Sequence, residues 1–249
     1  ANPTANLSYQ IKNNITDPRY KNNKLFAHLH CYNIDKFTEY YGEYHNNIKK
    51  YYSIIITYSV GNIRNLDYNF INGCIILKVS NKGIDIGSKL NALHYLNKAK
   101  IDYDYILFLH SKTDINKRYN YYHPLIGSLK QINYIRSIIY KYDAVFPNFI
   151  GNKVNGDWNV GKYFINKLYY QQINDFLNIK HKTNYFIEGN CYILSKKTIN
   201  YIWNERNIKL FYNLLNETNS FDLNWFKLYY NINNTSDNSI EKCYLKYKN

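Results

Sequence analysis

Residues 105–114 read YILFLHSKTD, an apolar run that ends in a cluster of polar side chains. The apolar part, Tyr105–His110, has the length and composition of a strand that is covered on both faces of a sheet. Comparable runs occur at Leu25–Tyr32, Tyr52–Ser59 and Cys74–Ser80. Each of these runs therefore predicts one strand of a buried sheet.

Segments with helical periodicity lie between the apolar runs. Strands that alternate with helices of this length favour right-handed crossovers and a parallel sheet. We therefore predict an α/β fold in which helices flank a mostly parallel sheet within a single domain. The expected helices are Asp35–Tyr51, Ser88–Ala99 and Gly127–Tyr142, and a fifth strand is expected at Asp143–Asn148.

The two ends of the chain are less regular than this central part. Residues 1–23 are polar and rich in Asn, and we interpret them as a leader to one domain that spans residues 24–249. No internal repeat and no linker rich in Pro, Gly or Ser divides that domain. In its second half the pattern predicts a helix near Val160–Ile173, a strand around Tyr185–Leu194, and helices near Lys197–Asn204 and Ile208–Asn216.

The composition is that of a globular protein with a basic surface. The hydrophobic fraction of 45% and the charged fraction of 20% exclude a disordered chain. The formal charge of +14 attracts polyanions and phosphorylated ligands, so nucleic acid is one candidate partner. The basic residues are nevertheless spread along the chain in short pairs such as Lys49-Lys50. The chain has 30 tyrosines. The codon bias of an AT-rich genome explains this number as readily as a role for the rings as platforms for sugars.

The spacing of the cysteines and the hydropathy of the chain predict the cellular compartment in which the protein is found. The four cysteines lack a CxxC pair, and Cys31, Cys74 and Cys191 lie in apolar runs that predict buried thiols under reducing conditions. No apolar stretch reaches the roughly 18–20 residues of a membrane span, and no signal peptide is recognisable. We therefore expect a soluble, cytoplasmic protein without a membrane span. Because the first residue is Ala, we expect a chain that is processed or cut from a longer protein.

Parallel α/β sheets bind ligands at the carboxyl ends of their strands, so the residues after each run are candidate site residues. His30 and Tyr32 close the first run, and they can hydrogen-bond or stack on a base. The third run is followed by the segment 81–89 (NKGIDIGSK), which lacks the spacing of a Walker loop or a dinucleotide fingerprint.

Two readings of the segment 81–89 remain open. In the functional one, the two glycines, Gly83 and Gly87, let the backbone approach a ligand, and the start of the helix favours an anion. Asp85 accepts a hydrogen bond from a ribose or sugar hydroxyl, Lys89 binds a phosphate, and Asn81 belongs to the same candidate binding segment. In the structural one, the segment is a strand-to-helix turn in which Asp85 or Ser88 is the N-cap.

The fourth run continues directly into the polar residues 110–114. Lys112 can neutralise a leaving diphosphate, and His110 with Asp114 can do so through a metal ion. The alternative is a polar turn in which Thr113 or Asp114 caps the next helix. The position at a strand end favours the functional interpretation.

Two acidic residues of the second half are candidates for a general base. Asp157 lies in the turn NGDW beside an aromatic ring, and Glu188 lies beside a glycine in the apolar run FIEGNCY. A partly desolvated carboxylate suits a general base. The alternative for Glu188 is an acid at a strand end that is exposed to water.

Four motifs in this order resemble the rhamnan-synthesis F family, which includes bacterial and giant-virus members. They are His28–His30 (HLH), residues 81–87 (NKGIDIG), residues 105–114 (YILFLHSKTD) and residues 186–192 (FIEGNCY). The resemblance covers about residues 25 to 200, which is most of the chain. For a viral member, the host cytoplasm or a virus factory is the expected location.

The resemblance implies a GT-A-like (Rossmann-like) glycosyltransferase, which moves a sugar from a nucleoside diphosphate to an acceptor hydroxyl in glycan or polysaccharide synthesis. The donor half would span about residues 24–150 and the acceptor half about 151–249, and a UDP- or dTDP-linked sugar is favoured. His110 and Lys112 occupy the positions of the usual Asp-x-Asp metal motif. Either His110 and Asp114 hold Mn²⁺ or Mg²⁺, or Lys112 replaces the ion.

The mechanism implied by the resemblance needs one base and one cation. Glu188 first, and Asp157 second, would remove the acceptor proton, and Lys112 would stabilise the departing diphosphate. A single base implies inversion at the anomeric carbon. Two other classes stay open: a nucleic-acid-binding domain that uses the basic, aromatic-rich surface, and a non-catalytic module that binds a nucleotide or a sugar.

Overall fold

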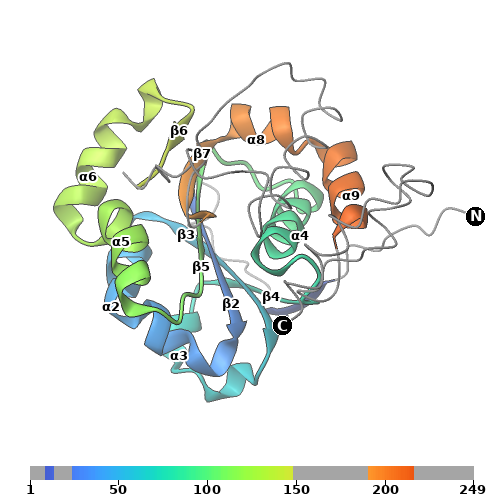
Figure 1. Cartoon of the computed structure of the whole chain (residues 1–249), viewed down its shortest axis with the longest axis horizontal. Coiled ribbons are helices and arrows are strands. Elements are labelled where there is room, and N and C mark those ends of the chain that lie inside the picture. Colours follow the sequence, from blue (N-terminus) through green and yellow to red (C-terminus); the bar gives the residue numbers. More distant parts are fainter. Residues whose placement is uncertain (1–8, 14–23, 148–189, 216–249) are drawn as a thin grey trace, which may run out of the picture. The chain divides into compact units, whose positions relative to one another are not determined.

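Seven strands form one mixed sheet in the computed structural model, which describes residues 9–13, 24–147 and 190–215. Their order across the sheet is β1-β4-β3-β2-β5-β7-β6 (Figure 1). The strands are β1 Tyr9–Asn13, β2 Leu25–Asn33, β3 Ser53–Val60, β4 Ile75–Val79, β5 Tyr105–His110, β6 Ala144–Val145 and β7 Tyr192–Ser195.

The sheet has a parallel centre and antiparallel margins. Strands β4, β3, β2 and β5 pair in parallel, whereas β1, β7 and β6 join through antiparallel pairings. The prediction of an α/β fold is confirmed, but the prediction of a mostly parallel sheet is wrong outside the four central strands. Hydrophobic runs indicate where strands lie, but they do not encode the direction of the neighbouring strand.

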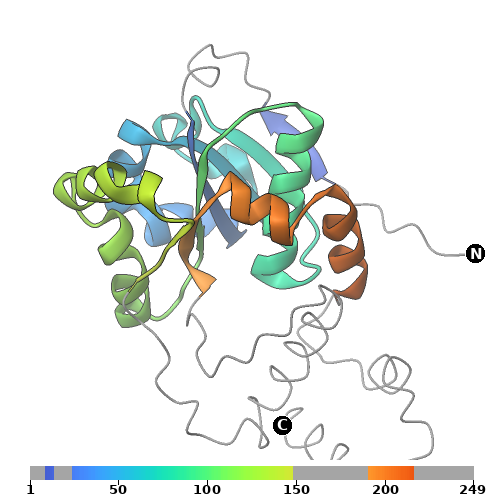
Figure 2. The same ribbon diagram turned by 90° about the horizontal axis from the view of Figure 1, so that it is seen from above.

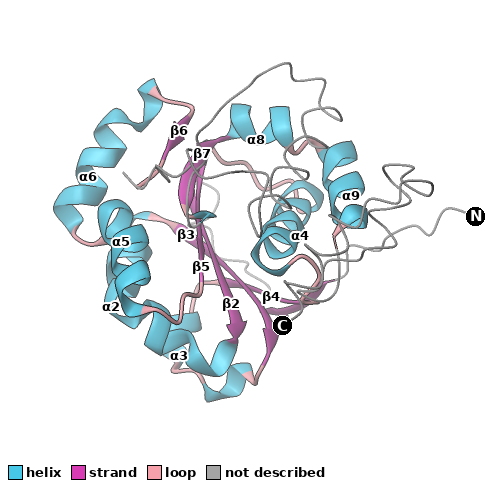
Figure 3. Ribbon diagram, in the orientation of Figure 1, coloured by secondary structure: helices cyan, strands magenta, loops and turns pink. Residues whose placement is uncertain are grey.

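Helices cover both faces of the sheet, as the two perpendicular views and the colouring by secondary structure show (Figures 1, 2 and 3). One face carries α2, α3, α5 and α6, and the other carries α4, α8 and α9. The helices are α2 Phe37–Tyr51, α3 Tyr68–Ile71, α4 Ile84–Lys98, α5 Ile115–Ile126, α6 Leu129–Ile138, α8 Lys196–Ile202 and α9 Glu205–Leu214, with 3₁₀ turns η1 Ile34–Lys36, η2 Ile63–Asn65 and η3 Ile139–Lys141.

Alternation along the strands separates an apolar core from a polar layer. Leu29 and Cys31 of β2 pack into the core beneath α2 and α5. His28 and His30 alternate with them, so they point to the opposite face, where α4 lies. The prediction of buried thiols is confirmed for the three cysteines of the described residues, which are free: Cys31, Cys74 and Cys191.

The four long apolar runs match the expected strands closely, and three other elements differ from the prediction. Helix α4 begins at Ile84, not at Ser88, and its N-cap is Gly83, so neither Asp85 nor Ser88 caps it. Helix α5 is not among the helices expected by range, but the alternative in which Asp114 caps the next helix is confirmed, because α5 begins directly after Asp114 and its side chain caps it. The expected fifth strand is only two residues long in β6.

Several expectations fall on other parts of the chain. The helix expected near Val160–Ile173 and the first residues of the strand expected at Tyr185–Leu194 lie outside the described residues. Residues 9–13, within the expected leader, form β1 and pair with β4. All described residues belong to one compact unit of the chain. None of the helices in the described residues combines the length and the hydropathy of a membrane-spanning segment.

Candidate functional site

The strand order creates a topological switch point between β2 and β5. The helix that follows β2, α2, covers one face of the sheet, whereas α4, which leads into β5, covers the other (Figures 1 and 2). In open α/β sheets, ligands bind in the crevice outside the carboxyl ends of the strands at this point. His30 and His110 are register partners on β2 and β5 at that end.

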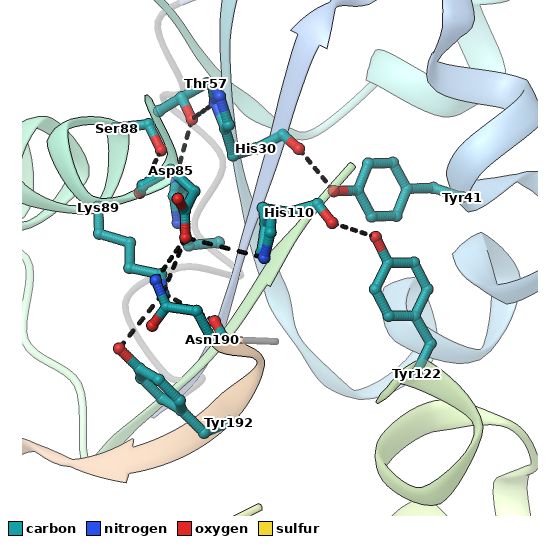
Figure 4. Close-up of polar contacts among 11 residues, drawn as sticks. His30, Tyr41, Thr57, Asp85, Ser88, Lys89, His110, Tyr122, Asn190 and Tyr192 are labelled. Atoms are coloured by element: carbon teal, nitrogen blue, oxygen red, sulfur yellow. Dashed lines mark hydrogen bonds and ion pairs between the residues drawn. The ribbon is translucent and has the colours of Figure 1, made fainter. Parts of the chain in front are cut away.

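Asp85 connects this pair of strands to α4. It lies in the first turn of α4, and its Oδ2 atom is 3.7 Å from Nε2 of His110 and 3.9 Å from Nζ of Lys89. The same oxygen accepts a hydrogen bond from the side-chain amide of Asn190 (Figure 4). Burial by itself raises the pKa of the Asp85 carboxyl, but the charges of His110 and Lys89 and the Asn190 bond outweigh burial. The net pKa is lowered, so the carboxylate is ionised at neutral pH.

Lys89 is a buried cation one helical turn beyond Asp85, and it is only 1% exposed. Its ammonium donates to the main-chain oxygen of Asn190 at 2.8 Å and to the Tyr192 hydroxyl at 3.3 Å. It also lies 4.5 Å from the centroid of the Tyr192 ring, a cation–π distance. Burial lowers the pKa of Lys89 to about 8, against the opposing effect of Asp85.

Two neutral histidines lie behind this ion pair. Oγ1 of Thr57, on β3, is 2.8 Å from Nε2 of His28 and 3.0 Å from Nδ1 of His30. A hydroxyl has one proton to donate, so one of these ring nitrogens accepts from Thr57 and the other donates to it. Burial lowers the pKa of His30 to about 4, and the pKa of His28 is lowered well below its usual value for the same reason.

His30 keeps one polar atom toward the site. Its Nε2 atom is buried and has no hydrogen-bond partner within residues 9–13, 24–147 and 190–215. Buried polar atoms of native proteins are generally paired, so such an atom at a switch point is a candidate contact for a ligand. The Oδ1 atom of Asn81, in the loop before α4, is also buried and has no hydrogen-bond partner among the described residues.

Backbone requirements explain the sequence around Asp85. Gly83 has a φ of 67°, a left-handed conformation that favours glycine at this N-cap. A Cβ on Gly87 would lie 1.7 Å from the main-chain oxygen of Lys82, so the first turn of α4 cannot form around a larger residue. Asn190, with a φ of 53°, is also left-handed. In this conformation its side-chain amide donates to Asp85 and its main-chain oxygen accepts from Lys89, both on α4.

The structure brings together four of the residues expected at the donor site: His30, Asp85, Lys89 and His110. Two others lie at the same strand ends without entering this cluster. Tyr32 is 45% exposed, and its amide donates to Ser111 Oγ at 3.4 Å. Lys112 is half-buried, with its ammonium 5.4 Å from the centroid of the Tyr121 ring.

The carboxylate of Asp114 is engaged elsewhere. It is exposed and accepts the amide hydrogen of Lys117 at 3.0 Å, which caps α5. Among the described residues, no group of three or more His, Cys, Asp or Glu side chains is arranged to hold a metal ion. Glu188 and Asp157, the expected general bases, lie outside the described residues.

Sequence reasoning did not select Thr57, Asn190 or Tyr192 for the site. Thr57 directly follows three isoleucines in the strand YSIIITYS, and its hydroxyl near the carboxyl end of that strand is a signal of a site residue. Asn190 and Tyr192 lie in the FIEGNCY motif, in which Glu188 is the one charged residue. Their contacts depend on β7 pairing next to β5, which no local pattern indicates.

Comparisons with known proteins add no relative: no protein-family model, curated protein or solved structure matches the chain. The class is therefore defined by the fold and the site alone. The chain is an α/β protein with a mixed sheet and helices on both faces. Its candidate site is a charged cluster at the carboxyl ends of β2 and β5.

Proposed function

We propose that the chain is a nucleotide-sugar-dependent glycosyltransferase with a GT-A-like fold, which transfers a sugar from a nucleoside-diphosphate donor to an acceptor hydroxyl. The observation that carries this proposal is the meeting of Asp85 and His110 at the switch point between β2 and β5. The strand order β4-β3-β2-β5 is the order 3-2-1-4 of nucleotide-binding α/β sheets, whose ligands lie at that point.

The cluster suits the hydroxyl groups of a nucleotide sugar. The ionised Asp85 carboxylate accepts hydrogen bonds from ribose or sugar hydroxyls, and these charge-assisted bonds are the strong ones. The neutral ring of His30 offers its unpartnered Nε2 atom as a further contact. Tyr32, which is exposed at the end of β2, supplies a ring on which a base can stack.

The leaving diphosphate needs positive charge. The described residues do not fit a divalent metal, because Asp114 is the cap of α5 and no three-ligand group is present among them. We therefore assign the stabilisation of the diphosphate to Lys112, which lies just beyond the end of β5 and whose ammonium acts as a fixed cation. Lys89 is too deeply buried for this role and instead neutralises Asp85.

The acceptor side of the proposal rests on the sequence. Glu188, or Asp157 in second place, would take the proton of the acceptor hydroxyl as it attacks the anomeric carbon, with inversion of configuration. The bond from the anomeric carbon to the diphosphate oxygen breaks, and the diphosphate leaves with the electron pair. Replacing Glu188 with Gln should reduce turnover and leave donor binding nearly unchanged.

A thermal-shift panel tests the donor site. The ligands are UDP, GDP, dTDP, CMP and their sugars, each with and without Mn²⁺. A ligand that binds only the folded state raises Tm by mass action, worth about 2.7 kcal/mol at one hundred times Kd. We expect a shift with one nucleotide class, and we expect Lys112→Ala to reduce it while Lys117→Ala, a neighbouring exposed lysine, does not.

The same panel separates the rival functions. No shift with any nucleotide, together with salt-dependent binding of DNA or RNA, would replace the proposal with a nucleic-acid-binding domain. A shift without sugar transfer or hydrolysis would indicate a non-catalytic binding module. A shift that requires Mn²⁺ would contradict the role assigned to Lys112.

A further inference from the structure

Two stacked tyrosines lie on the far side of the sheet from Asp85. Tyr41 of α2 and Tyr122 of α5 have nearly parallel rings, with centroids 5.7 Å apart and an interplanar angle of 6°. Both side chains are fully buried in the apolar core. Aromatic pairs of this kind usually contribute through packing, but their hydroxyl groups make a further and specific contact.

Each hydroxyl donates to the backbone of one site histidine (Figure 4). The Tyr41 hydroxyl bonds to the main-chain oxygen of His30 at 2.6 Å, and the Tyr122 hydroxyl bonds to the main-chain oxygen of His110. These two histidines are register partners. The tyrosine pair therefore contacts β2 and β5 at the two residues, His30 and His110, whose side chains belong to the candidate site.

The hydrogen bonds meet a need of the backbone at this point. Strand β5 ends at His110, and the chain then turns away from the sheet toward α5. The His30 oxygen already accepts the Ser111 amide at 2.8 Å, so the Tyr41 hydroxyl is its second donor. Without the tyrosine hydroxyls, the buried His30 oxygen and the partly buried His110 oxygen would each lose a hydrogen-bond donor.

Both hydroxyls can act only as donors to these carbonyl groups. Burial raises the pKa of Tyr41 and of Tyr122 well above the ordinary value of 10, so both hydroxyls are protonated at neutral pH. Ionisation of the tyrosines therefore does not break these two bonds at neutral pH.

We propose that Tyr41 and Tyr122 are positioning residues, which set the His30 and His110 rings relative to Asp85 by holding their main-chain oxygens. Their consequence for ligand binding rests on the proposed function, because it assumes that a nucleotide contacts these rings. The positioning itself is a property of the free protein. The alternative is that the tyrosines only fill space in the core.

Tyrosine-to-phenylalanine substitutions separate positioning from packing, because they remove one hydroxyl and keep the ring. The control is Tyr44→Phe, a buried tyrosine of α2 whose ring meets Tyr122 edge-on at 5.7 Å. The first readout is the pair of imidazole ¹³C–¹H cross-peaks of His30 and His110 in the labelled, ligand-free full chain. The second is the affinity for the nucleotide that responds in the thermal-shift panel.

We expect Tyr41→Phe to move the His30 cross-peak, Tyr122→Phe to move the His110 cross-peak, and Tyr44→Phe to move neither. Each of the first two should weaken nucleotide binding about tenfold, the factor that corresponds to about 1.4 kcal/mol. A lower Tm with unmoved cross-peaks would overturn the proposal. If no nucleotide binds the unmodified chain, the proposed function fails, and the cross-peaks still decide the positioning.

A measurement on the unmodified chain covers the case in which a variant does not fold. A hydroxyl proton held between Tyr41 and the His30 oxygen exchanges slowly with water, and it lies near the Ser111 amide that bonds to the same oxygen. We expect a protected hydroxyl resonance with a nuclear Overhauser effect to that amide. Absence of the resonance under conditions where other buried hydroxyls are observed would overturn the proposal.

Discussion

The Asp85 carboxylate lies 3.9 Å from the ammonium of Lys89, one turn further along α4. Lys89 is 1% exposed in its side chain, whereas Asp85 is 16% exposed. The carboxylate therefore has two roles. Toward the core it is the counter-ion of a buried cation, and toward the site it is the ionised group that faces His110. Under the proposed function, stability and nucleotide binding are therefore coupled through this one residue.

The coupling predicts a specific result for Asp85→Asn. The substitution keeps the size of the side chain but leaves Lys89 buried without its counter-ion, and breaking a buried pair in this way costs about 3 kcal/mol. We expect urea unfolding to show a loss of that order. The double variant Asp85→Asn with Lys89→Met removes both charges and should recover much of the lost stability. Equal stabilities for the single and double variants would contradict the pairing.

Acid should destabilise the protein through its buried histidines. Burial lowers the pKa of His30 and of His45 to about 4, and His28 is shifted in the same direction. Because these folded-state values lie below the unfolded value of 6.5, the unfolded chain binds more protons between pH 6.5 and 4. Stability is therefore fully present above that window and is lost as the pH falls through it.

For a single histidine with these values, the expected loss between pH 7.5 and pH 5 is about 2 kcal/mol. Urea unfolding at several pH values measures it. His45 offers the matched control, because its ring contacts the Phe70 main-chain oxygen away from the candidate site, and Gln can donate the same bond. The slope of the unfolding free energy against pH reports how many more protons the unfolded chain binds than the folded one. His45→Gln should lower this number by about one between pH 6.5 and 4. An unchanged slope would show that His45 titrates normally.

The charged network at the opposite end of the sheet should matter much less. Asp102 forms ion pairs with Lys24 and Lys196, and hydrogen bonds from Lys196 and Lys24 hold its pKa well below the usual range. All three side chains are more than 40% exposed, so solvent screens the interaction. We expect Asp102→Asn to cost at most about 1 kcal/mol. The loss should disappear in concentrated NaCl, and a loss that salt leaves unchanged would contradict this account.

The central strands were predictable because each is a continuous apolar run of strand length. The runs Leu25–Tyr32 and Tyr105–His110 are buried on both faces except at their last residues, and they correspond to β2 and β5 almost residue for residue. The rule that ligands bind at strand ends then selected His30 and His110 without any knowledge of their pairing. These features depend on local sequence alone.

The rest of the site depends on long-range pairing. Asn190 contacts Asp85 because β7 lies antiparallel beside β5. The local sequence of neither strand indicates that the two pair, or in which direction. Thr57 joins two histidines because β3 lies on the far side of β2 from β5. The predicted start of α4, Ser88, lies later than the observed start, Ile84, because Gly83 caps the helix through its backbone conformation and no side chain signals the cap.

The glycine at position 87 gives the sharpest test of how the site is built. A Cβ at this position would lie 1.7 Å from the main-chain oxygen of Lys82, and a backbone atom cannot move aside as the end of a side chain can. Gly87→Ala must therefore displace the first turn of α4 and, with it, Asp85. We expect a large loss of stability together with loss of nucleotide binding.

Gly42, in the middle of α2, provides the matched control. A Cβ there would lie 3.3 Å from Cγ2 of Thr38, a side-chain atom that can shift slightly. Because glycine within a helix is less favourable than alanine by roughly 0.5–1 kcal/mol, Gly42→Ala should leave stability unchanged or raise it slightly. Urea unfolding and nucleotide thermal shifts of the two variants give the comparison. If Gly87→Ala were as stable as Gly42→Ala, the tight turn before Asp85 could not be what places the carboxylate against His110.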